Sequence, residues 1–397
     1  MIVPFNKPCL TGKELHYISE SVLSGQISGD GIFTQKCQKL LEETFDSKKV
    51  FMTTSCTDAL EMASILINLN PGDEVIVPSF TFVSTVNAFY LRAARPVFVD
   101  IRKDTLNLDE ALIEEKVTER TKAIFPVHYA GVACEMDEIM KIAHRFNLYV
   151  VEDAAHGMNA TYNGKYLGTI GDFGAFSFHE TKNFTCGEGG ALIINDEKYI
   201  ERAEIVREKG TNRSKFFRGE VDKYTWVDIG SSFLPSDVLS AFLFAQLEYM
   251  GEITEKRKRI YNLYYDSLID LQYEGKLILP FIPENCTTSY HMFYILLPNE
   301  NERNSLMEFL KGKGVHAIFH YIPLHSSPIG ESLGYKNGDL PVTEEISQRI
   351  LRLPFYNSLT EKEQIHVIES VKIFFKGAKG TAEKSNNARA SILTGPD

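Results

Sequence analysis

Hydrophobic and polar positions follow two different periods along the first 240 residues. Short runs of apolar and β-branched residues recur, as is typical of buried strands. They span residues 74–77, 96–100, 123–128, 148–152, 175–178 and 191–194. Between several of these runs, apolar residues recur at spacings of three and four, as at Met136, Ile139, Met140 and Ala143, which places them on one face of a helix. The alternation predicts an α/β fold with a mainly parallel sheet covered on both sides by helices.

The pattern changes after about Ser236. A long helical stretch runs to roughly Tyr273 and is followed by an apolar segment at 291–297, a helix near Leu306, a strand near His316 and terminal helices. We therefore expect a large domain at 1–240 and a smaller α+β domain at 241–377. Residues 378–397 are mostly small and polar without apolar periodicity. They predict a tail that is disordered or was added to the natural chain.

Composition and charge exclude several classes of protein. The chain has 397 residues, and 53 acidic against 42 basic residues give a net charge of -11 without a basic stripe. Nucleic acid is therefore not an expected partner. No run approaches the roughly 20 apolar residues that span a bilayer, and the N-terminus lacks the pattern of a secretion signal. The six cysteines are far apart and form no C-x-x-C motif. We expect a cytoplasmic enzyme with reduced thiols and no membrane partner.

In sheets of this kind, ligands bind beyond the carboxyl ends of the strands. Asp153 stands at the end of the apolar run at 148–152. A carboxylate there could keep the ring nitrogen of pyridoxal phosphate protonated, which makes the ring an electron sink. The alternative is that Asp153 only caps a helix, since Asp is favoured at that position.

Hydroxyl-bearing residues mark a second candidate segment, where a short strand leads into an apolar-faced helix. Ser55, Cys56 and Thr57 lie at this junction. Free backbone N–H groups and the helix dipole favour an anion such as phosphate at a helix start. The alternative is an ordinary Ser/Thr cap.

Lys182 is the third candidate, because it follows the strand at 175–178 and precedes the glycine-rich turn at 187–190. Removal from water lowers the pKa of an ammonium group, and Schiff-base chemistry requires the unprotonated amine. A single lysine is usually a solvated surface residue. The prediction therefore depends on Lys182 together with Asp153 and the loop at 55–57.

With these residues the chain resembles the DegT/DnrJ/StrS group of sugar aminotransferases, which have the aspartate aminotransferase fold, over roughly residues 3–375. The resemblance rests on the segments 54–57, 78–83, 151–156, 177–182 and 187–190. It implies a fold type I enzyme dependent on pyridoxal 5'-phosphate, in which Lys182 forms the internal aldimine, Asp153 pairs with the pyridinium nitrogen and Phe82 stacks on the ring.

The same resemblance implies that Ser177 and the loop Ser55–Cys56–Thr57 bind the phosphate and that His156 lies beside the ring. Two positions depart from the usual pattern of the family. Cys56 replaces a glycine, and Ser232 replaces an asparagine that reaches the phosphate of a neighbouring subunit. Ser232 would replace that contact only in part. A homodimer or a higher homo-oligomer is expected.

Three further segments, at 127–137, 207–213 and 228–232, resemble one subgroup of this family. Its members make dTDP-4-amino-4,6-dideoxy-D-galactose from dTDP-4-keto-6-deoxy-D-glucose, with L-glutamate as amino donor, on the route to enterobacterial common antigen. The resemblance alone supports amination at C4. Other possibilities are amination at C3 or of another nucleotide sugar, a sugar dehydratase with histidine at the lysine position, or a regulator that binds the cofactor without turnover.

Substrate contacts are expected at His320, Tyr321 and His325, which the resemblance places near the pocket. Arg213 belongs to a basic cluster that could hold a nucleotide pyrophosphate, since arginine binds phosphate oxygens through two N–H groups. A solvated loop is the alternative for this cluster. The spacing of His316, His320 and His325 could suggest a metal, but no acid or thiol completes a ligand set, so no metal is expected.

Overall fold

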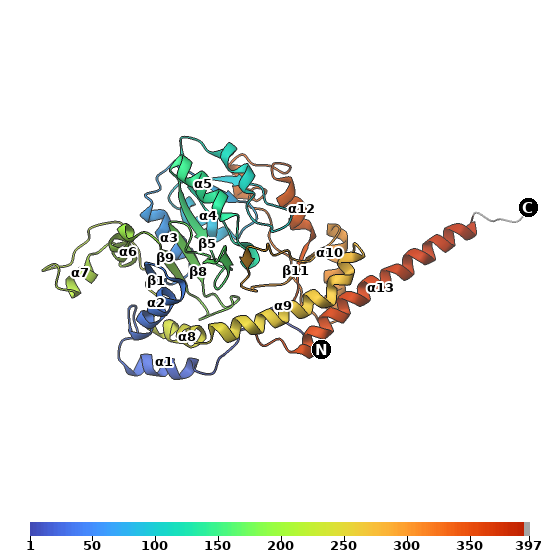
Figure 1. The fold of residues 1–397 in the computed structure, drawn as a ribbon, viewed down its shortest axis with the longest axis horizontal. Coiled ribbons are helices and arrows are strands. Elements are labelled where there is room, and N and C mark those ends of the chain that lie inside the picture. Colours follow the sequence, from blue (N-terminus) through green and yellow to red (C-terminus); the bar gives the residue numbers. More distant parts are fainter. Residues whose placement is uncertain (393–397) are drawn as a thin grey trace, which may run out of the picture.

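A seven-stranded sheet forms the centre of the protein, and the computed structural model describes residues 1–392, with side-chain surroundings for residues 1–377 (Figure 1). The strand order is β1-β9-β8-β5-β4-β2-β3. The strands are β1 (Lys49–Thr53), β2 (Glu74–Pro78), β3 (Arg95–Val99), β4 (Thr121–Ile124), β5 (Tyr149–Asp153), β8 (Phe173–Ser177) and β9 (Gly190–Ile194). Neighbouring strands from β3 to β8 are parallel, whereas β9 is antiparallel to both β8 and β1. The predicted α/β fold with a mainly parallel sheet is confirmed.

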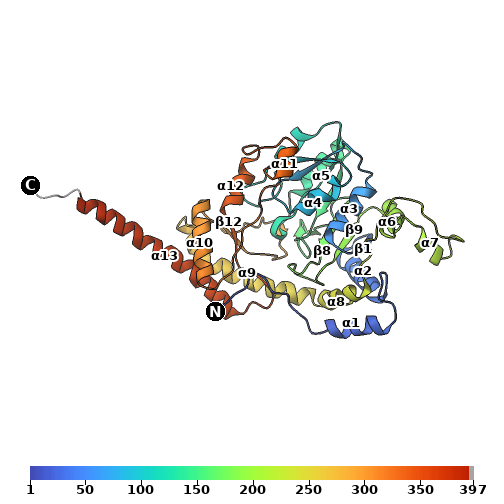
Figure 2. The ribbon, with the colours of Figure 1, turned by 180° about the vertical axis from the view of Figure 1, so that it is seen from behind.

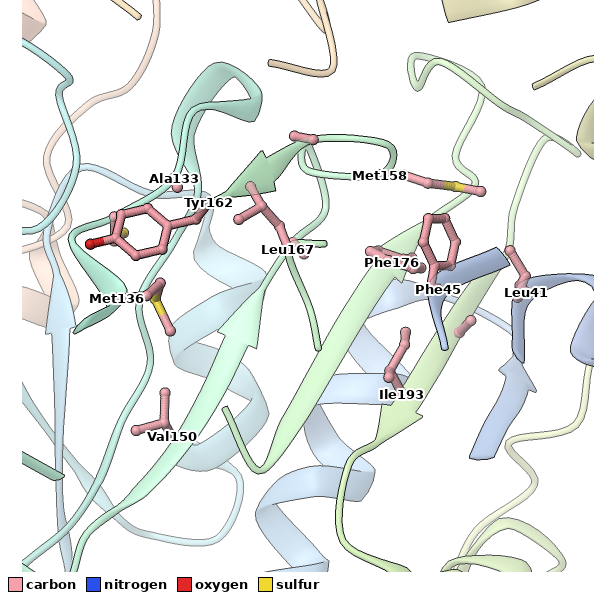
Figure 3. Packing of buried hydrophobic residues seen from close by; sticks show 14 of the residues in the cluster. Leu41, Phe45, Ala133, Met136, Val150, Met158, Tyr162, Leu167, Phe176 and Ile193 are labelled. Carbon is pink, nitrogen blue, oxygen red and sulfur yellow. The ribbon is translucent and has the colours of Figure 1, made fainter. Parts of the chain in front are cut away.

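Helices cover both faces of this sheet. On one face, α2 (Ile32–Phe45), α5 (Met136–Phe146) and α8 (Asp237–Leu247) pack on a core that includes Val150 and Ile193 (Figure 3). On the other face, α3 (Cys56–Leu66), α4 (Val83–Tyr90) and α6 (Ile200–Arg207) pack on Val151 and Leu192. Successive strand residues thus enter opposite cores, which explains why the strands read as continuous apolar runs.

Helix α5 has the expected amphipathic face. Met136, Ile139 and Ala143 are buried as predicted, together with Ile142. Met140 is only half-buried at the edge of the same core.

The C-terminal third forms its own core around a small two-stranded sheet. Strands β11 (Tyr294–Leu296) and β12 (Ile350–Arg352) pair antiparallel. The helices here are α9 (Met250–Tyr273), α10 (Glu300–Gly312), α11 (Pro328–Ser332), α12 (Pro341–Arg349) and α13 (Glu361–Ile392). Figure 2 shows α9 running from the sheet to this second core. The domain limits at 240 and 241 fall inside α8 and remain predictions.

Two sequence expectations differ from this structure. The helical stretch that ends at Tyr273 is two helices, because the backbone at Tyr249 leaves helical geometry (φ -108°, ψ 21°). Near His316 there is no strand in the described chain, only isolated bridges of Val315 with Val3 and of Ile318 with Arg352. The expected tail at 378–397 lies outside the residues whose side chains are described, and 393–397 lie outside the described residues altogether.

The remaining elements are short or peripheral. They are α1 (Glu14–Leu23), α7 (Arg213–Phe217), β6 (Thr161–Tyr162), β7 (Lys165–Tyr166) and β10 (Cys286–Thr287), with 3₁₀ turns η1 (Glu110–Leu112), η2 (Glu114–Lys116), η3 (Tyr129–Gly131) and η4 (Glu197–Tyr199). Over the described residues, none of the helices combines the length and the apolar character that crossing a bilayer requires.

Candidate active site

Lys182 lies in the connection between β8 and β9, which turns back at the carboxyl end of β8 because the two strands are antiparallel. Its backbone N–H donates to the carbonyl oxygen of His179 (2.9 Å), which closes a tight turn. Burial lowers the pKa of the Lys182 amine to about 8. The Cys56 side chain and the Asp153 carboxylate oppose this shift, and the positive charge of Arg352 adds to it. The protonation of Lys182 is therefore coupled to these three residues.

Asn183 anchors the turn on its other side. Its Nδ2 donates to the carbonyl oxygen of Ser289 (2.7 Å), and its Oδ1 is hydrogen-bonded to Nδ1 of His291 (2.9 Å). Both contacts reach into the C-terminal third of the chain. The turn that carries Lys182 is thus fixed between the central sheet and the smaller core.

Asp153 is the last residue of β5 and is buried. Its Oδ2 accepts from the hydroxyl of Thr85 in α4 (2.7 Å), and its Oδ1 accepts from the backbone N–H of Ala155 (3.1 Å). The residues after Asp153 form turns rather than a helix. The helix-cap alternative is therefore wrong, and the carboxylate is held at the strand end beside α4.

Phe82 immediately precedes α4, so the helix that binds Asp153 also places this aromatic ring. The side chain is 57% exposed, which is unusual for phenylalanine. Its ring centroid lies 6.4 Å from that of Tyr321. Helix α4 therefore fixes both an exposed aromatic ring, at its start, and the buried carboxylate, through Thr85.

The loop at 55–57 joins β1 to α3. Ser55 is the N-cap of α3, and its Oγ accepts from the backbone N–H of Asp58 (3.0 Å), so the cap interpretation is correct for this residue. Thr57 donates through its hydroxyl to Oγ of Ser84 in α4 (2.9 Å). Cys56 is half-buried, and burial raises the pKa of its thiol.

Gly190, the first residue of β9, lies between this loop and the end of β8. A Cβ atom on Gly190 would lie 2.3 Å from the carbonyl carbon of Ser55 and 2.4 Å from the nitrogen of Cys56, so no larger residue fits. Gly190 pairs with Ser177 across the β8–β9 ladder. Ser177 is thereby placed beside the start of α3.

His156 is buried and stacks on His291, with ring centroids 4.2 Å apart. Its Nδ1 has no hydrogen-bond partner among the described residues. Burial lowers the pKa of His156 well below its usual value, and the positive charges of Lys182 and Arg352 act in the same direction. The ring is therefore neutral and carries one unsatisfied nitrogen.

Two of the expected substrate residues join this group. His320 stacks on Tyr321 at 3.9 Å, and its Nδ1 lies 3.3 Å from the hydroxyl of Tyr129. Nη1 of Arg352 donates to Nε2 of His320. The sequence reasoning had not singled out Tyr129, Asn183, His291 or Arg352. The available signal for Arg352 was its position as a charged residue inside the apolar run Ile350–Leu353.

His325 does not join the group. It is fully buried, with Nδ1 hydrogen-bonded to Oγ of Ser79 (2.8 Å) and Nε2 to Oε1 of Glu344 (2.9 Å). Both ring nitrogens are occupied within the protein, so His325 has none left for a substrate. His316 is exposed, and no cluster of three metal-ligating side chains occurs in the part of the chain that is described.

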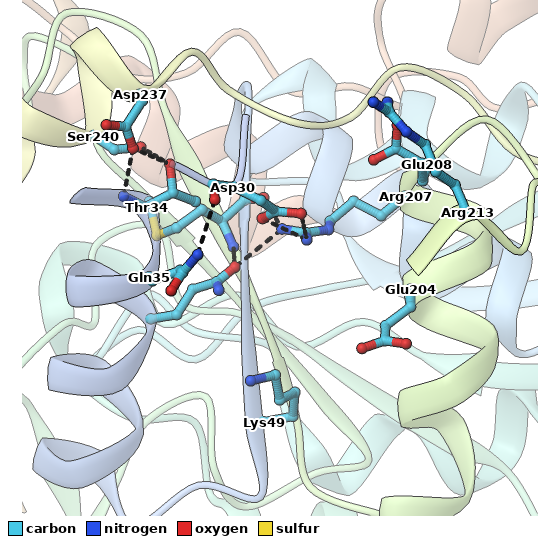
Figure 4. Close-up of polar contacts among 12 residues, drawn as sticks. Asp30, Thr34, Gln35, Lys49, Glu204, Arg207, Glu208, Arg213, Asp237 and Ser240 are labelled. Carbon is cyan, nitrogen blue, oxygen red and sulfur yellow. Dashed lines mark hydrogen bonds and ion pairs between the residues drawn. The ribbon is translucent and has the colours of Figure 1, made fainter. Parts of the chain in front are cut away.

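Arg213 and Ser232 lie on a projecting segment, residues 208–232, which we call the arm (Figure 1). Arg213 pairs with Glu208 (3.0 Å), and both are labelled in Figure 4. Ser232 is exposed and forms an isolated β-bridge with Glu208. Four other basic residues in or beside the arm also pair with carboxylates. The pairs are Arg207 with Asp30, Lys209 with Glu208, Lys215 with Glu201, and Arg218 with Glu204 and Glu220.

Comparison with known proteins shows the family of this chain. The sequence profile of the DegT/DnrJ/EryC1/StrS aminotransferase family matches residues 8–372. An uncharacterised protein of Methanocaldococcus jannaschii is 37% identical over 93% of this chain and 96% of its own length. GDP-perosamine synthase of Escherichia coli O157:H7 is 32% identical over 94% of this chain and 98% of its own.

Solved structures also resemble this chain over nearly its whole length. A proposed sugar aminotransferase of Streptococcus pneumoniae, solved in its pyridoxal-phosphate form, superposes with a TM-score of 0.85 at 27% identity. The superposition covers 93% of this chain and 97% of the other. The same protein has also been solved in its pyridoxamine-phosphate form, so the cofactor is pyridoxal 5'-phosphate. The chain belongs to the DegT/DnrJ/EryC1/StrS aminotransferase family, and it is a sugar aminotransferase that depends on this cofactor.

Proposed function

We propose that this enzyme transfers the amino group of L-glutamate to C4 of dTDP-4-keto-6-deoxy-D-glucose and forms dTDP-4-amino-4,6-dideoxy-D-galactose. The observation that carries the chemistry is the meeting of the Lys182 amine, with its lowered pKa, and the buried Asp153 carboxylate in one site. The choice of nucleotide and of the C4 position rests on the likeness of the segments 127–137, 207–213 and 228–232 to one subgroup.

The side chains around Lys182 fit the cofactor group by group. Asp153 would hold the protonated ring nitrogen, and the exposed face of Phe82 would stack on the ring. His156 offers a buried, unpaired Nδ1 to a polar substituent of the ring. Ser177 and the N–H groups at the start of α3, with Ser55, Cys56 and Thr57, would hold the phosphate. When bound, the cofactor supplies the electron sink that makes the α-proton of the donor acidic.

Lys182 would act twice in this reaction. Its Nζ would hold the cofactor, and as a free amine it would take a proton from the α-carbon of the donor. A pKa of about 8 leaves about a tenth of this amine unprotonated at pH 7, and a proton acceptor must be unprotonated. In the second half of the reaction the same nitrogen returns a proton to C4 of the sugar.

One observation favours a different nucleotide as the second candidate. The 32% identical relative from Escherichia coli is a GDP-perosamine synthase, so its name places the sugar on GDP rather than dTDP. Amination at C3 is a further variant of the same chemistry. A dehydratase is less well supported, because related dehydratases carry histidine where this chain has Lys182. A regulator without turnover would bind the cofactor but form no 2-oxoglutarate from glutamate.

A comparison of substrates tests this proposal. The enzyme is incubated with L-glutamate and, in parallel, with the dTDP-linked and the GDP-linked 4-keto-6-deoxy sugars, and the products are identified by NMR. We expect kcat/KM to be at least about tenfold higher for the dTDP sugar, and the amine to be axial at C4. Preference for the GDP sugar, or amination at C3, would contradict the proposal and leave the family assignment intact.

A further inference from the structure

One short segment, residues 288–291 in the connection between β10 and β11, contacts three turns of the site. Oγ of Ser289 donates to the carbonyl oxygen of His156 (2.5 Å), and the carbonyl oxygen of Ser289 accepts from Nδ2 of Asn183 (2.7 Å). A Cβ atom on Gly131, in η3, would lie 1.9 Å from Oγ of Ser289 and 2.8 Å from the carbonyl oxygen of His156. The turn after β5, the β8–β9 connection and η3 therefore meet at this segment.

Arg257 in α9 fixes the segment from behind. Its Nε donates to the carbonyl oxygen of Tyr290 (2.8 Å), its Nη2 to that of His291 (2.5 Å), and its Nη1 to Oδ1 of Asn357 (2.9 Å). The arginine itself is 3% exposed. Tyr290 has a φ of 50°, a backbone conformation that residues other than glycine keep only where their surroundings impose it. The segment is thus held in a strained conformation by a buried guanidinium group.

The hydrogen bonds of Asn183 decide which nitrogen of His291 carries the proton. Nδ2 of Asn183 donates to Ser289, so its Oδ1 is the atom that lies 2.9 Å from Nδ1 of His291. An amide oxygen only accepts, and Nδ1 of His291 must therefore be protonated. Burial lowers the pKa of His291 well below its usual value, and the positive charges of Lys182 and Arg257 act in the same direction. The ring is neutral, with its single proton on Nδ1.

The face of the same ring stacks on His156. The two ring centroids lie 4.2 Å apart, and the ring planes differ by 16°. His156 follows Asp153 by three residues, and its Nδ1 is buried without a hydrogen-bond partner among the described residues. The stack and the bond from Ser289 orient the His156 ring. His291 therefore contacts both the neighbour of Lys182 in the chain and the ring that lies near this lysine.

We propose that His291 is a positioning residue of the reaction: its Nδ1–H group holds the turn of Lys182 through Asn183, and its ring face holds the plane of His156. The inference rests on the proposed function, in which Lys182 moves a proton and His156 faces the cofactor ring. His291 acts through these two neighbours rather than on the reacting atoms.

The first test needs neither donor nor sugar. ¹⁵N NMR of the protein labelled at histidine distinguishes the two neutral forms of an imidazole ring by the shifts of their nitrogens. In the unaltered protein, with and without cofactor, we expect a neutral ring protonated at Nδ1 whose signals disappear in His291→Phe. If the signals that disappear belong to a ring protonated at Nε2, or to a charged ring, the inference is wrong.

Two variants separate the two contacts of His291. His291→Asn places an amide N–H group close to the position of Nδ1, so it keeps the bond to Asn183 but has no ring. His291→Phe keeps a ring against His156 but cannot donate. The donor half-reaction of the holoenzyme, run with L-glutamate and without sugar, is followed by the absorbance of the cofactor. We expect kcat to fall about tenfold or more in each variant, with KM within about threefold, because neither contact reaches the donor.

Asn183→Ala shows whether the hydrogen bond is the path to Lys182. Added to His291→Phe it should slow the half-reaction by less than about twofold more, because both changes remove the same bond. Added to His291→Asn, which keeps the bond, it should slow the half-reaction by about as much as it does alone. His144→Asn is the matched control, since His144 is exposed in the last turn of α5. It should leave kcat unchanged.

Thermal unfolding shows whether each variant is folded, and His291→Asn serves if the phenylalanine variant is not. Unchanged kcat in the folded His291 variants, or a loss that lies only in KM, would overturn the inference. So would equal effects of Asn183→Ala in the two His291 backgrounds. Because no sugar is used, rejection of every dTDP sugar would overturn the proposed function and leave this test intact.

Discussion

At the scale of single residues, the site depends on a lysine made less basic by burial. Its pKa of about 8 lies well below the 10.5 of an exposed lysine. Desolvation is the largest cause, and Asp153 and Arg352 act on the amine in opposite directions. The protonation of Lys182 in the β8–β9 connection is thus set by its burial and by groups on three other elements: the end of β5, the start of α3, and β12.

The pH dependence of cofactor attachment follows from this arrangement. The unprotonated amine is the reactive form, so the rate at which cofactor-free protein takes up pyridoxal phosphate should rise with pH around a midpoint of about 8. Asp153 raises this pKa, and Asp153→Asn should therefore move the midpoint to lower pH. Stopped-flow absorbance measures the rate. A midpoint near 10.5 would show that the amine is solvated and would contradict the geometry.

The sequence predicted the site residues that lie at strand ends but not those that the smaller core contributes. Lys182, Asp153 and the loop at 55–57 are close in space because parallel strands present their carboxyl ends at one edge. No comparable rule predicts where the segments that carry Arg352 and His291 lie. Their position near Lys182 is therefore seen only in the folded chain. His325 was expected near the substrate but is occupied by Ser79 and Glu344, and no local pattern reveals that pairing.

At the scale of elements, the apolar runs located most strands to within a few residues, and the mainly parallel arrangement was predicted except for β9. The reversal of β9 was not predicted, because a buried strand has the same apolar pattern in either direction. This reversal is what folds the β8–β9 connection back over the sheet edge with Lys182 in it. The break between α8 and α9 was also missed, since the apolar pattern continues across it.

The close approach of Gly190 to the start of α3 gives a prediction about this part of the fold. In Gly190→Ala the new Cβ would meet the backbone of Ser55 and Cys56, so the loop must move. We expect the Kd for pyridoxal phosphate to rise at least about tenfold, and the free energy of unfolding to fall by about 1–3 kcal/mol. Absorbance titration and urea denaturation measure the two effects.

The matched control for this variant is Gly251→Ala. Gly251 lies within α9, and a Cβ there meets nothing within 4 Å. Alanine should leave cofactor binding unchanged and raise the free energy of unfolding by up to about 1 kcal/mol, because it favours a helix more than glycine does. Equal cofactor affinity in both variants would show that the contact between β9 and the loop does not position the phosphate site.

At the scale of the whole molecule, the arm at 208–232 exposes apolar surface that the rest of a single described chain does not cover. Several of its large apolar side chains are exposed, and they are Phe216, Phe217, Tyr224, Trp226, Val227 and Ile229. A cluster of exposed aromatic residues on a projecting segment is typical of a protein interface. The arm also carries Ser232, the position expected to reach the phosphate of a neighbouring subunit. These observations support the expected homodimer or higher homo-oligomer, and we propose the homodimer.

Trp226 makes this proposal measurable, because it is the single tryptophan of the chain and is 78% exposed in one subunit. In a homodimer that covers the arm, its fluorescence should be blue-shifted and protected from iodide, and sedimentation should give twice the chain mass. Trp226→Asp should weaken the dimer. Tyr273→Asp, which changes a similarly exposed aromatic residue at the end of α9, should not. A monomer with a fully quenched Trp226 would contradict the proposal.

The central claim is that Lys182 transfers an amino group from glutamate to a dTDP-linked keto sugar. The most direct test is incubation with ¹⁵N-labelled L-glutamate and dTDP-4-keto-6-deoxy-D-glucose, followed by NMR of the sugar. The account predicts ¹⁵N bonded to C4 of a galactose-configured product, one 2-oxoglutarate for each amine formed, and loss of both products and of the visible absorbance of the lysine-bound cofactor in Lys182→Ala. Formation of the labelled sugar by Lys182→Ala, or no labelled sugar from the unaltered enzyme, would contradict it.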